Sequence, residues 1–423
     1  MQRSLTSDTD AEAVARRAPH VRGCADIGED DISEDGIDHD DSRAAAGAGF
    51  RRLTLTNFRS YAFADVRFDG RPATFIGANG AGKTNLLEAL SMFGPGRGLR
   101  SARLDDLARA EGDGRFAVAA RFADADGDDG RALGVGIDRT PDGGAARACR
   151  LDGATARGPI AFADIVRFSW LTPAQDGLFT AAAGERRRFL DRIAQTQDAG
   201  HSRAAADYEA AARQRQRLLD ERRGDEAWLS ALETRMAEAG VALAAGRRDA
   251  ATTLASFDVS GLADGAFPAA VIAIEGELEA ALDGAVAADV EDAFVAELKA
   301  RRRRDADAGR ATYGPHRSDL IVSHRAKGTL ARLCSTGEQK ALLIGLVLAN
   351  ACALARRAGA APLVLLFDEI AAHLDPNRRA ALFDIVDGLG LQCFMTGTDE
   401  SLFASWGRRA QAFRVEGGAV HEI

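Results

Sequence analysis

The stretch that decides the fold of this chain is Gly77-Ala78-Asn79-Gly80-Ala81-Gly82-Lys83-Thr84. It fits G-x-x-x-x-G-K-[ST], in which glycines let backbone N–H groups approach phosphate oxygens closely. In this pattern Lys83 neutralises the β- and γ-phosphates of ATP, and the Thr84 hydroxyl is a ligand for Mg²⁺. A strand pattern at residues 73–76 precedes the loop and a helix-forming segment at 85–90 follows it. We therefore predict an α/β fold with a nucleotide at a strand–helix junction.

The acidic complement of this loop lies far along the chain, at Leu363–Glu369. An apolar strand pattern ends there in two acids. Asp368 is placed to hold Mg²⁺, and Glu369 is the candidate catalytic residue that polarises the attacking water. Both acids could instead be ordinary strand-end residues, but the phosphate loop upstream favours function. Thr84 and Asp368 are 284 residues apart, so we predict that another module interrupts the nucleotide-binding domain.

Composition and pattern divide the chain into four parts. Residues 1–48 hold twelve acids and five arginines and predict a disordered acidic extension, or an over-extended gene start that is never made. Residues 49–180 carry strand patterns and the phosphate loop. In 181–310, apolar residues recur at three- to four-residue steps, which predicts a helical lobe without an extended coiled coil. Residues 311–423 return to strands and complete the ATPase domain.

Charge and apolar runs limit the possible partners. The net charge is −9, of which the first 48 residues carry −7, so the other 375 carry −2 and can still present a basic face. The longest apolar run, Ala341–Ala355, is shorter than the roughly 20 residues of a membrane span. It predicts a buried helix and no membrane partner. Five scattered cysteines and no visible signal peptide indicate a reduced, cytoplasmic protein.

The segment Ser335-Thr336-Gly337-Glu338-Gln339-Lys340 discriminates between classes of P-loop protein. Its order resembles the signature loop of ABC-type ATPases, where Ser335, Gly337 and Glu338 would act in trans on the nucleotide of a second copy. Alone, Ser-Thr-Gly-Glu is also a helix N-cap box. Its position between the two nucleotide half-motifs favours the signature loop. Asp375, just beyond Glu369, lies where this class has its D-loop, although Asp-Pro is also an ordinary helix entry.

Several segments together resemble the RecF family of bacterial DNA repair proteins. They are Leu53–Tyr61, Trp170–Pro173, Gly184–Asp191, Tyr313–Leu320 and the loop at 335–340. The resemblance runs from about 51 to 418 and implies an SMC-like, ABC-type P-loop ATPase head with an inserted α-helical lobe. It implies a protein that forms an ATP-dependent homodimer on single-stranded, duplex and gapped DNA. It also implies that the protein acts with RecR and RecO to load RecA at single-strand gaps.

Two departures from the pattern of ABC ATPases indicate a slow switch. The segment 168–172 lacks a glutamine at the usual Q-loop place, and Gln175 is shifted from it. The segment 396–399 has no histidine where many ABC ATPases keep a γ-phosphate sensor. We therefore expect a weak, DNA-stimulated ATPase whose hydrolysis releases DNA. Two alternatives remain, namely another ABC-class subunit and a DNA-scaffolding protein in which ATP is structural.

Two arginine runs are candidates for DNA contact. The first is Arg301, Arg302, Arg303 and Arg304, and the second is 186–188. Either run could bind phosphates through charge. Either could instead be a salt-bridged helix face, because acids stand at Glu185, Asp191, Asp305 and Asp307. His316 and Arg317 lie in a distinctive segment that suits either binding or packing.

Overall fold

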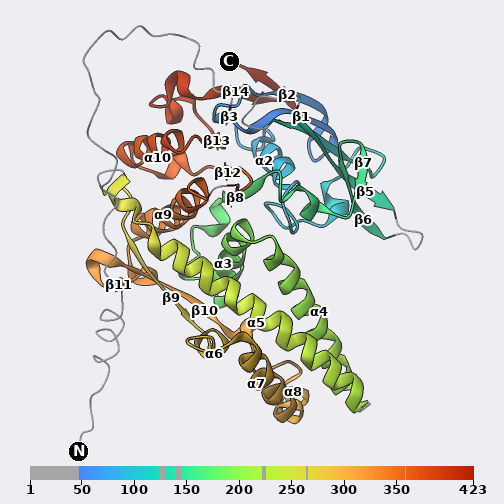
Figure 1. Cartoon of the computed structure of the whole chain (residues 1–423). Helices are drawn as coiled ribbons and strands as arrows, with labels where there is room; N and C mark the ends of the chain where they lie inside the picture. The colour runs from blue at the N-terminus through green and yellow to red at the C-terminus, as the bar shows by residue number, and fades with distance from the viewer. Residues whose placement is uncertain (1–46, 124–129, 140–143, 222–224, 263–264, 358) are drawn as a thin grey trace, which may run out of the picture. The chain divides into compact units, whose positions relative to one another are not determined.

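The computed structural model of the protein (Figure 1) describes residues 47–123, 130–139, 144–221, 225–262, 265–357 and 359–423. These residues belong to one unit of the chain, Asp40–Ile423. The acidic extension expected at 1–48 lies outside the described residues, except for its last two positions.

A six-stranded sheet carries the nucleotide motifs, in the order β15-β14-β3-β13-β12-β8. Its strands are parallel except for β15, which pairs antiparallel with β14. Every residue of β12 and β13 is buried, as expected for parallel strands covered on both faces. The strand predicted to end in the acid pair of Leu363–Glu369 is confirmed as β12. The bounds are β3 Ala73–Ile76, β8 Arg167–Leu171, β12 Leu363–Phe367, β13 Cys393–Gly397, β14 Gln411–Glu416 and β15 Ala419–Glu422.

A second, antiparallel sheet has the order β2-β1-β4-β5-β6-β7. Helix α2, Lys83–Ser91, packs between the two sheets, so its leucines share one core with side chains such as Phe75 and Phe122 (Figure 1). Phe50 meets Phe122 edge to face, with ring centroids 5.0 Å apart. The bounds are β1 Gly49–Phe58, β2 Tyr61–Arg67, β4 Ala117–Ala123, β5 Arg131–Arg139, β6 Ala145–Leu151 and β7 Ala154–Ala156.

Helices dominate the range predicted as a lobe. Helices α4 and α5 pack along each other and enclose a separate core with α7, in which Met236 and Phe294 are buried. The C-terminal end of α5 packs in the head core and contacts α9, so this long helix connects the lobe to the head. The helices are α3 Ala183–Gln197, α4 Gly200–Asp220, α5 Glu226–Ser256, α6 Glu277–Ala281, α7 Ala287–Ala300 and α8 Arg302–Ala308.

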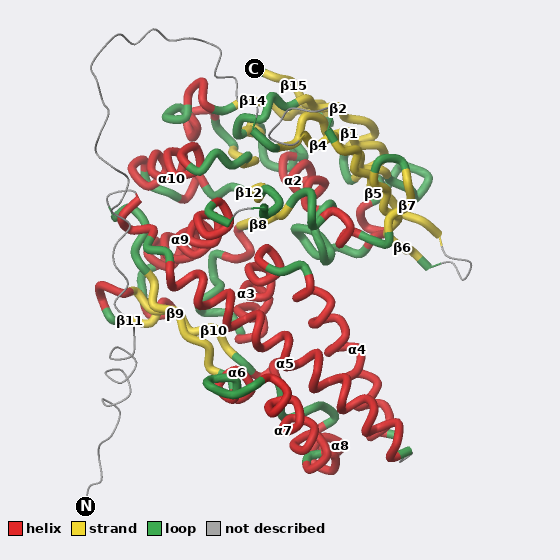
Figure 2. Tube along the Cα trace, viewed as in Figure 1, coloured by secondary structure: helices red, strands yellow, loops and turns green. Residues whose placement is uncertain are grey.

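The range 181–310 is not purely helical. Strand β9, Ala270–Glu275, runs beside α5 (Figure 2) and pairs with β10, Asp319–His324, which in turn pairs with β11, Thr329–Leu330. Ile272 and Ile274 pack against the head core while Val271 is exposed, which is the two-residue period of a strand. A three-stranded sheet therefore joins the end of the expected lobe to the C-terminal part of the head.

Helix α9, Thr336–Ala355, is the core helix of the head. Among the described residues it is the one helix long and apolar enough to cross a membrane, and 83% of its most apolar window is buried inside the protein. The buried helix predicted at 341–355 is confirmed. Helix α10, Pro376–Gly388, follows β12 and precedes β13.

Candidate nucleotide site and signature loop

The loop from Gly77 to Thr84 joins β3 to α2 in a shape that needs its glycines. Gly80 and Gly82 have φ angles of 80° and 107°, which side chains rarely adopt. A Cβ on Gly77 would lie 2.3 Å from the Val415 carbonyl oxygen. Helix α2 begins at Lys83 without a side-chain cap, so its first N–H groups can bind phosphate oxygens.

Lys83 is nearly buried beneath this loop. Its Nζ donates to the carbonyl oxygens of Gly77 at 2.7 Å and Ala78 at 2.9 Å. Burial lowers the pKa of the Lys83 ammonium, and the nearby Glu369 and Asp368 carboxylates oppose this shift. The cation is therefore held at the phosphate loop in direct contact with its backbone.

The structure brings Thr84 and Asp368 together across the 284 residues that separate them. Thr84 Oγ1 donates to Asp368 Oδ1 at 2.8 Å, and Thr396 Oγ1 donates to the same oxygen at 2.8 Å. A hydroxyl and a carboxylate side by side are hard oxygen ligands, which suit Mg²⁺ bound together with nucleotide phosphates. The donor set of Thr84 and Asp368 therefore fits the expected metal.

Glu369 lies beside this pair in an unusual backbone conformation. Its φ is 55°, in the left-handed region, and its N–H donates to Thr396 Oγ1 at 2.9 Å. Its carboxylate makes no hydrogen bond or ion pair with any described residue. Strained backbone of this kind occurs at functional sites. A carboxylate without a partner beside the Thr84–Asp368 pair can accept a proton from water.

Thr396 occupies the region where the sequence lacks the sensor histidine. Its hydroxyl joins the Asp368 carboxylate to the Glu369 backbone, and the side chain is fully buried. The next residue, Gly397, accepts a hydrogen bond from Gly77 N at 3.2 Å. The shifted Gln175 caps its own turn, because its Oε1 accepts from Thr172 N at 3.1 Å.

The segment Ser335–Lys340 forms the helix N-cap that the Ser-Thr-Gly-Glu pattern also allows. Ser335 is the N-cap of α9, with Ser335 Oγ accepting from Glu338 N at 3.4 Å and Glu338 Oε2 accepting from Ser335 N at 3.0 Å. An ion pair with Lys327 and these hydrogen bonds lower the pKa of Glu338 to about 2. Ser335 and Gly337 are exposed, so the cap also presents a helix N-terminus to the outside.

The expected D-loop residue is likewise a helix cap. Asp375 Oδ1 accepts from Arg378 N at 3.0 Å at the start of α10. The Arg378 guanidinium donates to the carbonyl oxygens of Ala266 at 3.0 Å and Gly337 at 3.4 Å. Arg378 therefore joins the first turn of α10 to the first turn of α9.

The sequence did not predict the hydrogen bonds that connect the β1–β2 turn to the phosphate loop and helix α2. Arg59 donates twice to the fully buried Glu88 of α2, both at 2.8 Å. Tyr61 Oη donates to the Gly82 carbonyl oxygen at 3.1 Å, and Asn85 Nδ2 donates to Ser60 Oγ at 2.9 Å. Arg59, Ser60 and Tyr61 belong to the segment Leu53–Tyr61, which entered the sequence analysis only through its family resemblance. The signal that marks them is the φ of 51° at Arg59, which the sequence does not reveal.

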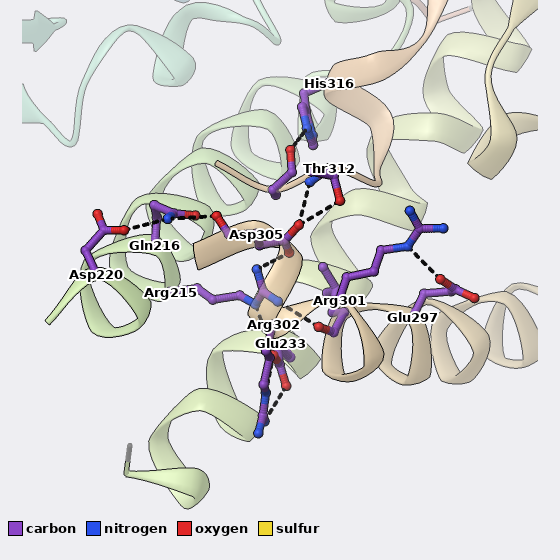
Figure 3. A network of polar contacts seen from close by, with 12 residues as sticks. Arg215, Gln216, Asp220, Glu233, Glu297, Arg301, Arg302, Asp305, Thr312 and His316 are labelled. Carbon is purple, nitrogen blue, oxygen red and sulfur yellow. Dashed lines mark hydrogen bonds and ion pairs between the residues drawn. The ribbon is translucent and has the colours of Figure 1, made fainter. Parts of the chain in front are cut away.

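The structure divides the first arginine run (Figure 3). Arg301 pairs with Glu297 at 2.7 Å and lies 4.9 Å from the Tyr313 ring centroid. Arg302 donates to Glu233 at 2.8 Å and also pairs with Glu226. These two arginines form the salt bridges of the alternative interpretation, and their contact with DNA stays a prediction.

Arg303 and Arg304 differ from the first two arginines. Both are exposed, and their guanidinium groups form no hydrogen bond or ion pair with the described part of the chain. Lys299 and Arg310 nearby in the sequence are also exposed, and their charged groups have no partner among those residues. This half of the run therefore carries charges that no internal ion pair neutralises.

The second run and His316 make contacts within the protein. Arg186 forms two hydrogen bonds with Asp319, at 2.7 and 2.6 Å. Arg187 donates to the Ser318 carbonyl oxygen at 2.5 Å, and Arg188 pairs with Glu185. His316 bonds Tyr208 Oη through Nδ1 and the Ala311 carbonyl oxygen through Nε2, and burial lowers its pKa.

The fold and site are those of an ABC-type P-loop ATPase head. They combine a phosphate loop on a parallel sheet, an acidic pair at the end of another strand of that sheet, and a core helix capped by Ser335. The model described as the RecF/RecN/SMC N terminal domain matches residues 50–421. The chain belongs to the RecF family. The predicted family and fold class are therefore confirmed.

Relatives in this family match nearly their whole length. The DNA replication and repair protein RecF of Mesorhizobium japonicum is 51% identical over 371 residues, covering 87% of this chain and 96% of that protein. The protein of the same name from Rhizobium johnstonii is 48% identical, covering 88% and 98%. A solved structure of the recombination mediator protein RecF-ATPrS in the RecFOR pathway has a TM-score of 0.75 at 20% identity, covering 89% and 98%. At that identity the solved structure shows the fold alone.

Proposed function

We propose that this protein is an ATP-dependent DNA-binding protein of recombinational repair and replication restart. It acts in the cytoplasm, binds DNA at single-strand gaps as an ATP-induced homodimer, and promotes RecA loading with RecR and RecO. Relatives that match 87% of the chain are called DNA replication and repair proteins. The observation that carries the proposal is the 2.8 Å contact of Thr84 with Asp368 beside the unpartnered Glu369.

The chain's own groups can bind and orient a nucleotide. Backbone N–H groups of 77–84 and of the first turn of α2 bind the phosphates, and Lys83 neutralises their charge. Thr84 and Asp368 would hold Mg²⁺, which supplies charge neutralisation when bound. Glu369 accepts a proton from the attacking water. The helix N-terminus at Ser335 and Gly337 of a second copy completes the site.

Hydrolysis serves as a slow switch in this proposal. Thr396, in place of a titratable histidine, fixes Asp368 and the Glu369 backbone but carries no charge to the γ-phosphate. A weak ATPase, stimulated by DNA, then limits the lifetime of the dimer and releases it.

The proposed DNA contact is the free half of the arginine run. Arg303 and Arg304, with Lys299 and Arg310, place four exposed cations within twelve residues of the lobe. Cations without an internal partner can bind phosphates at little cost, because no ion pair has to break. Arg301 and Arg302 support the helix that carries them.

The test follows dimer lifetime on gapped DNA. Wild type and Glu369→Gln are mixed with ATP and a gapped duplex, and their mass is followed by light scattering after excess competitor DNA is added. We expect both to dimerise and the variant to dissociate far more slowly. Monomers under all conditions, or equal lifetimes, would contradict the proposed switch. A dimer that forms without ATP would instead favour a scaffold.

A further inference from the structure

Strand β8 forms one edge of the nucleotide sheet, and its outer side has no partner strand in the described part of the chain. Asp368 N donates to Leu171 O at 2.9 Å, so the backbone of Leu171 faces β12. Hydrogen-bonding direction alternates along a strand, so the N–H and C=O groups of Phe168 and Trp170 point away from β12. These groups form no hydrogen bond with any described residue. An unpaired strand edge can take up a further strand.

A small cavity opens beside this edge. Phe168 and Trp170 line it, together with Ile160 and with Arg192 and Gln195 of α3. Its volume is about 20 Å³, which is room for one to two water-sized groups. Ile160 is 43% exposed, so the cavity has an apolar side chain at its surface. A carboxylate or a methyl group fits this space, whereas a nucleotide does not.

Arg192 lines the cavity without a carboxylate partner. Its guanidinium carbon lies 5.5 Å from the ring centroid of Trp170 and 5.8 Å from that of Phe189. The guanidinium forms no hydrogen bond or ion pair with a described residue, because Asp191 and Glu185 of the same helix pair with other arginines. Burial lowers the pKa of Arg192 to about 10. A half-buried cation without an acceptor gains from a carboxylate that enters the cavity.

Two further arginines add positive charge beside Arg192. Arg167 and Arg357 each donate to a backbone carbonyl oxygen at the C-terminal end of α3, at 2.7 and 2.8 Å. Neither forms an ion pair with a described residue. Burial and the nearby Arg357 guanidinium lower the pKa of Arg167, although Asp164 and Asp198 oppose the shift. The outer edge of β8 is therefore lined by arginines whose charge no ion pair neutralises.

We propose that an extended peptide segment of a partner protein, carrying carboxylate side chains, adds to the outer edge of β8 and places one carboxylate on Arg192. Its backbone pairs with Phe168 and Trp170, and its apolar side chains pack on Ile160. DNA fits this place less well, because the cavity is too small for a nucleotide and Ile160 offers phosphates nothing. The inference does not rest on the proposed homodimer or on the proposed DNA contact.

The binding probe is a fluorescent peptide in which aspartate and valine alternate over about eight residues, an ordinary strand length. Fluorescence anisotropy with the full-length protein should show saturable binding. The same peptide with asparagine in place of aspartate should bind at least about tenfold more weakly, because a hydrogen bond between two charged groups is stronger than one to a neutral amide. No binding of the aspartate peptide, or equal binding of both peptides, would overturn the proposal.

N-methylation of the peptide tests the backbone pairing. In an added strand, alternate N–H groups face β8 and the others face water. Methylation of one alternate set should abolish binding, and methylation of the other set should leave it unchanged. Equal effects of the two methylated peptides would show that the peptide does not pair with β8 as a strand, which contradicts the proposal.

Arg192→Met is the test variant, and Arg188→Met is the matched control on the same helix, because Arg188 is exposed and pairs with Glu185. Arg192→Met should bind the aspartate peptide at least about tenfold more weakly, and Arg188→Met should bind it as wild type does. The melting temperature and the ATP affinity of each variant report on folding, and the peptide comparisons need only the wild-type protein. Equal weakening in both variants would show that only total charge matters and would overturn the proposal. So would a labelled single-stranded oligonucleotide whose binding depends on Arg192 while the peptide does not bind.

Discussion

Replacing Arg303 and Arg304 together by alanine should weaken DNA binding and reduce its dependence on salt. Both guanidinium groups are exposed and have no partner among the described residues, whereas Arg301 and Arg302 of the same run bond to Glu297 and Glu233. The variant therefore removes charge from the surface without breaking an internal ion pair. The fold should remain intact, with an unchanged melting temperature.

The magnitude follows from counterion release. Each duplex phosphate neutralised by the protein contributes about 0.9 to the slope of log K against log salt concentration. Two arginines in each of two copies can contact four phosphates, so the slope should fall by up to about 3.6 in the dimer. The same contacts on single strands would give about 0.7 for each phosphate.

The assay is fluorescence anisotropy on a gapped duplex with ATP at several salt concentrations. The control is Arg188→Ala with Arg213→Ala, which removes the same charge from two exposed arginines that already pair with Glu185 and Glu209. This control should change the slope much less. An unchanged slope in Arg303→Ala/Arg304→Ala would refute the assignment, and an equal fall in both variants would show that only total charge matters.

Three further changes test other parts of the structure. Glu233→Gln removes the carboxylate charge that pairs with Arg215 and Arg302 inside the lobe, where Arg215 and Glu233 are at most 1% exposed. The free energy of unfolding measured in urea should fall by about 3–5 kcal/mol, and a loss below about 1 kcal/mol would contradict the buried network. Thr396→Val removes the hydrogen bond to Asp368, so kcat for ATP hydrolysis should fall roughly ten- to a hundredfold while ATP affinity is retained. Thr396→Ser keeps the hydroxyl and should behave as wild type. An equal loss of kcat in both variants would show that side-chain packing, not the hydrogen bond, is responsible. His316 has a pKa below its ordinary value of about 6.5, so its neutral form stabilises the fold above pH 6.5 and this contribution falls as pH drops below it. Urea unfolding between pH 5 and 8 should show that decline, and His316→Gln should show less of it.

The nucleotide half-motifs could be predicted because their chemistry is local. Glycines that permit positive φ, a lysine and a hydroxyl must stand at fixed spacing in the phosphate loop, and they follow one another in sequence. The strand at Leu363–Phe367 is a continuous apolar run because both its faces are buried. The two motifs assigned Thr84 and Asp368 to one site, and their side chains lie 2.8 Å apart in the structure.

The remaining features depend on partners distant in sequence. Glu233 is 69 residues from Arg302 and Glu88 is 29 from Arg59, so no local pattern tells a paired arginine from a free one. Strand β9 was missed because its short alternating segment lies between helices and is stabilised by β10, which follows 44 residues later from Glu275 to Asp319. Contacts between residues distant in sequence determine these ion pairs and this strand, and local secondary-structure propensity does not.

In the proposed dimer, two copies of the chain share each ATP site. Lys83→Met lacks the phosphate-binding cation, and Ser335→Arg blocks the signature helix N-terminus, so neither variant alone should hydrolyse ATP. Mixed one to one, half of the dimers are heterodimers with one intact site, and the mixture should recover up to about a quarter of the wild-type DNA-stimulated rate. A mixture that stays as inactive as its components would contradict shared sites, and so would full activity in Ser335→Arg alone.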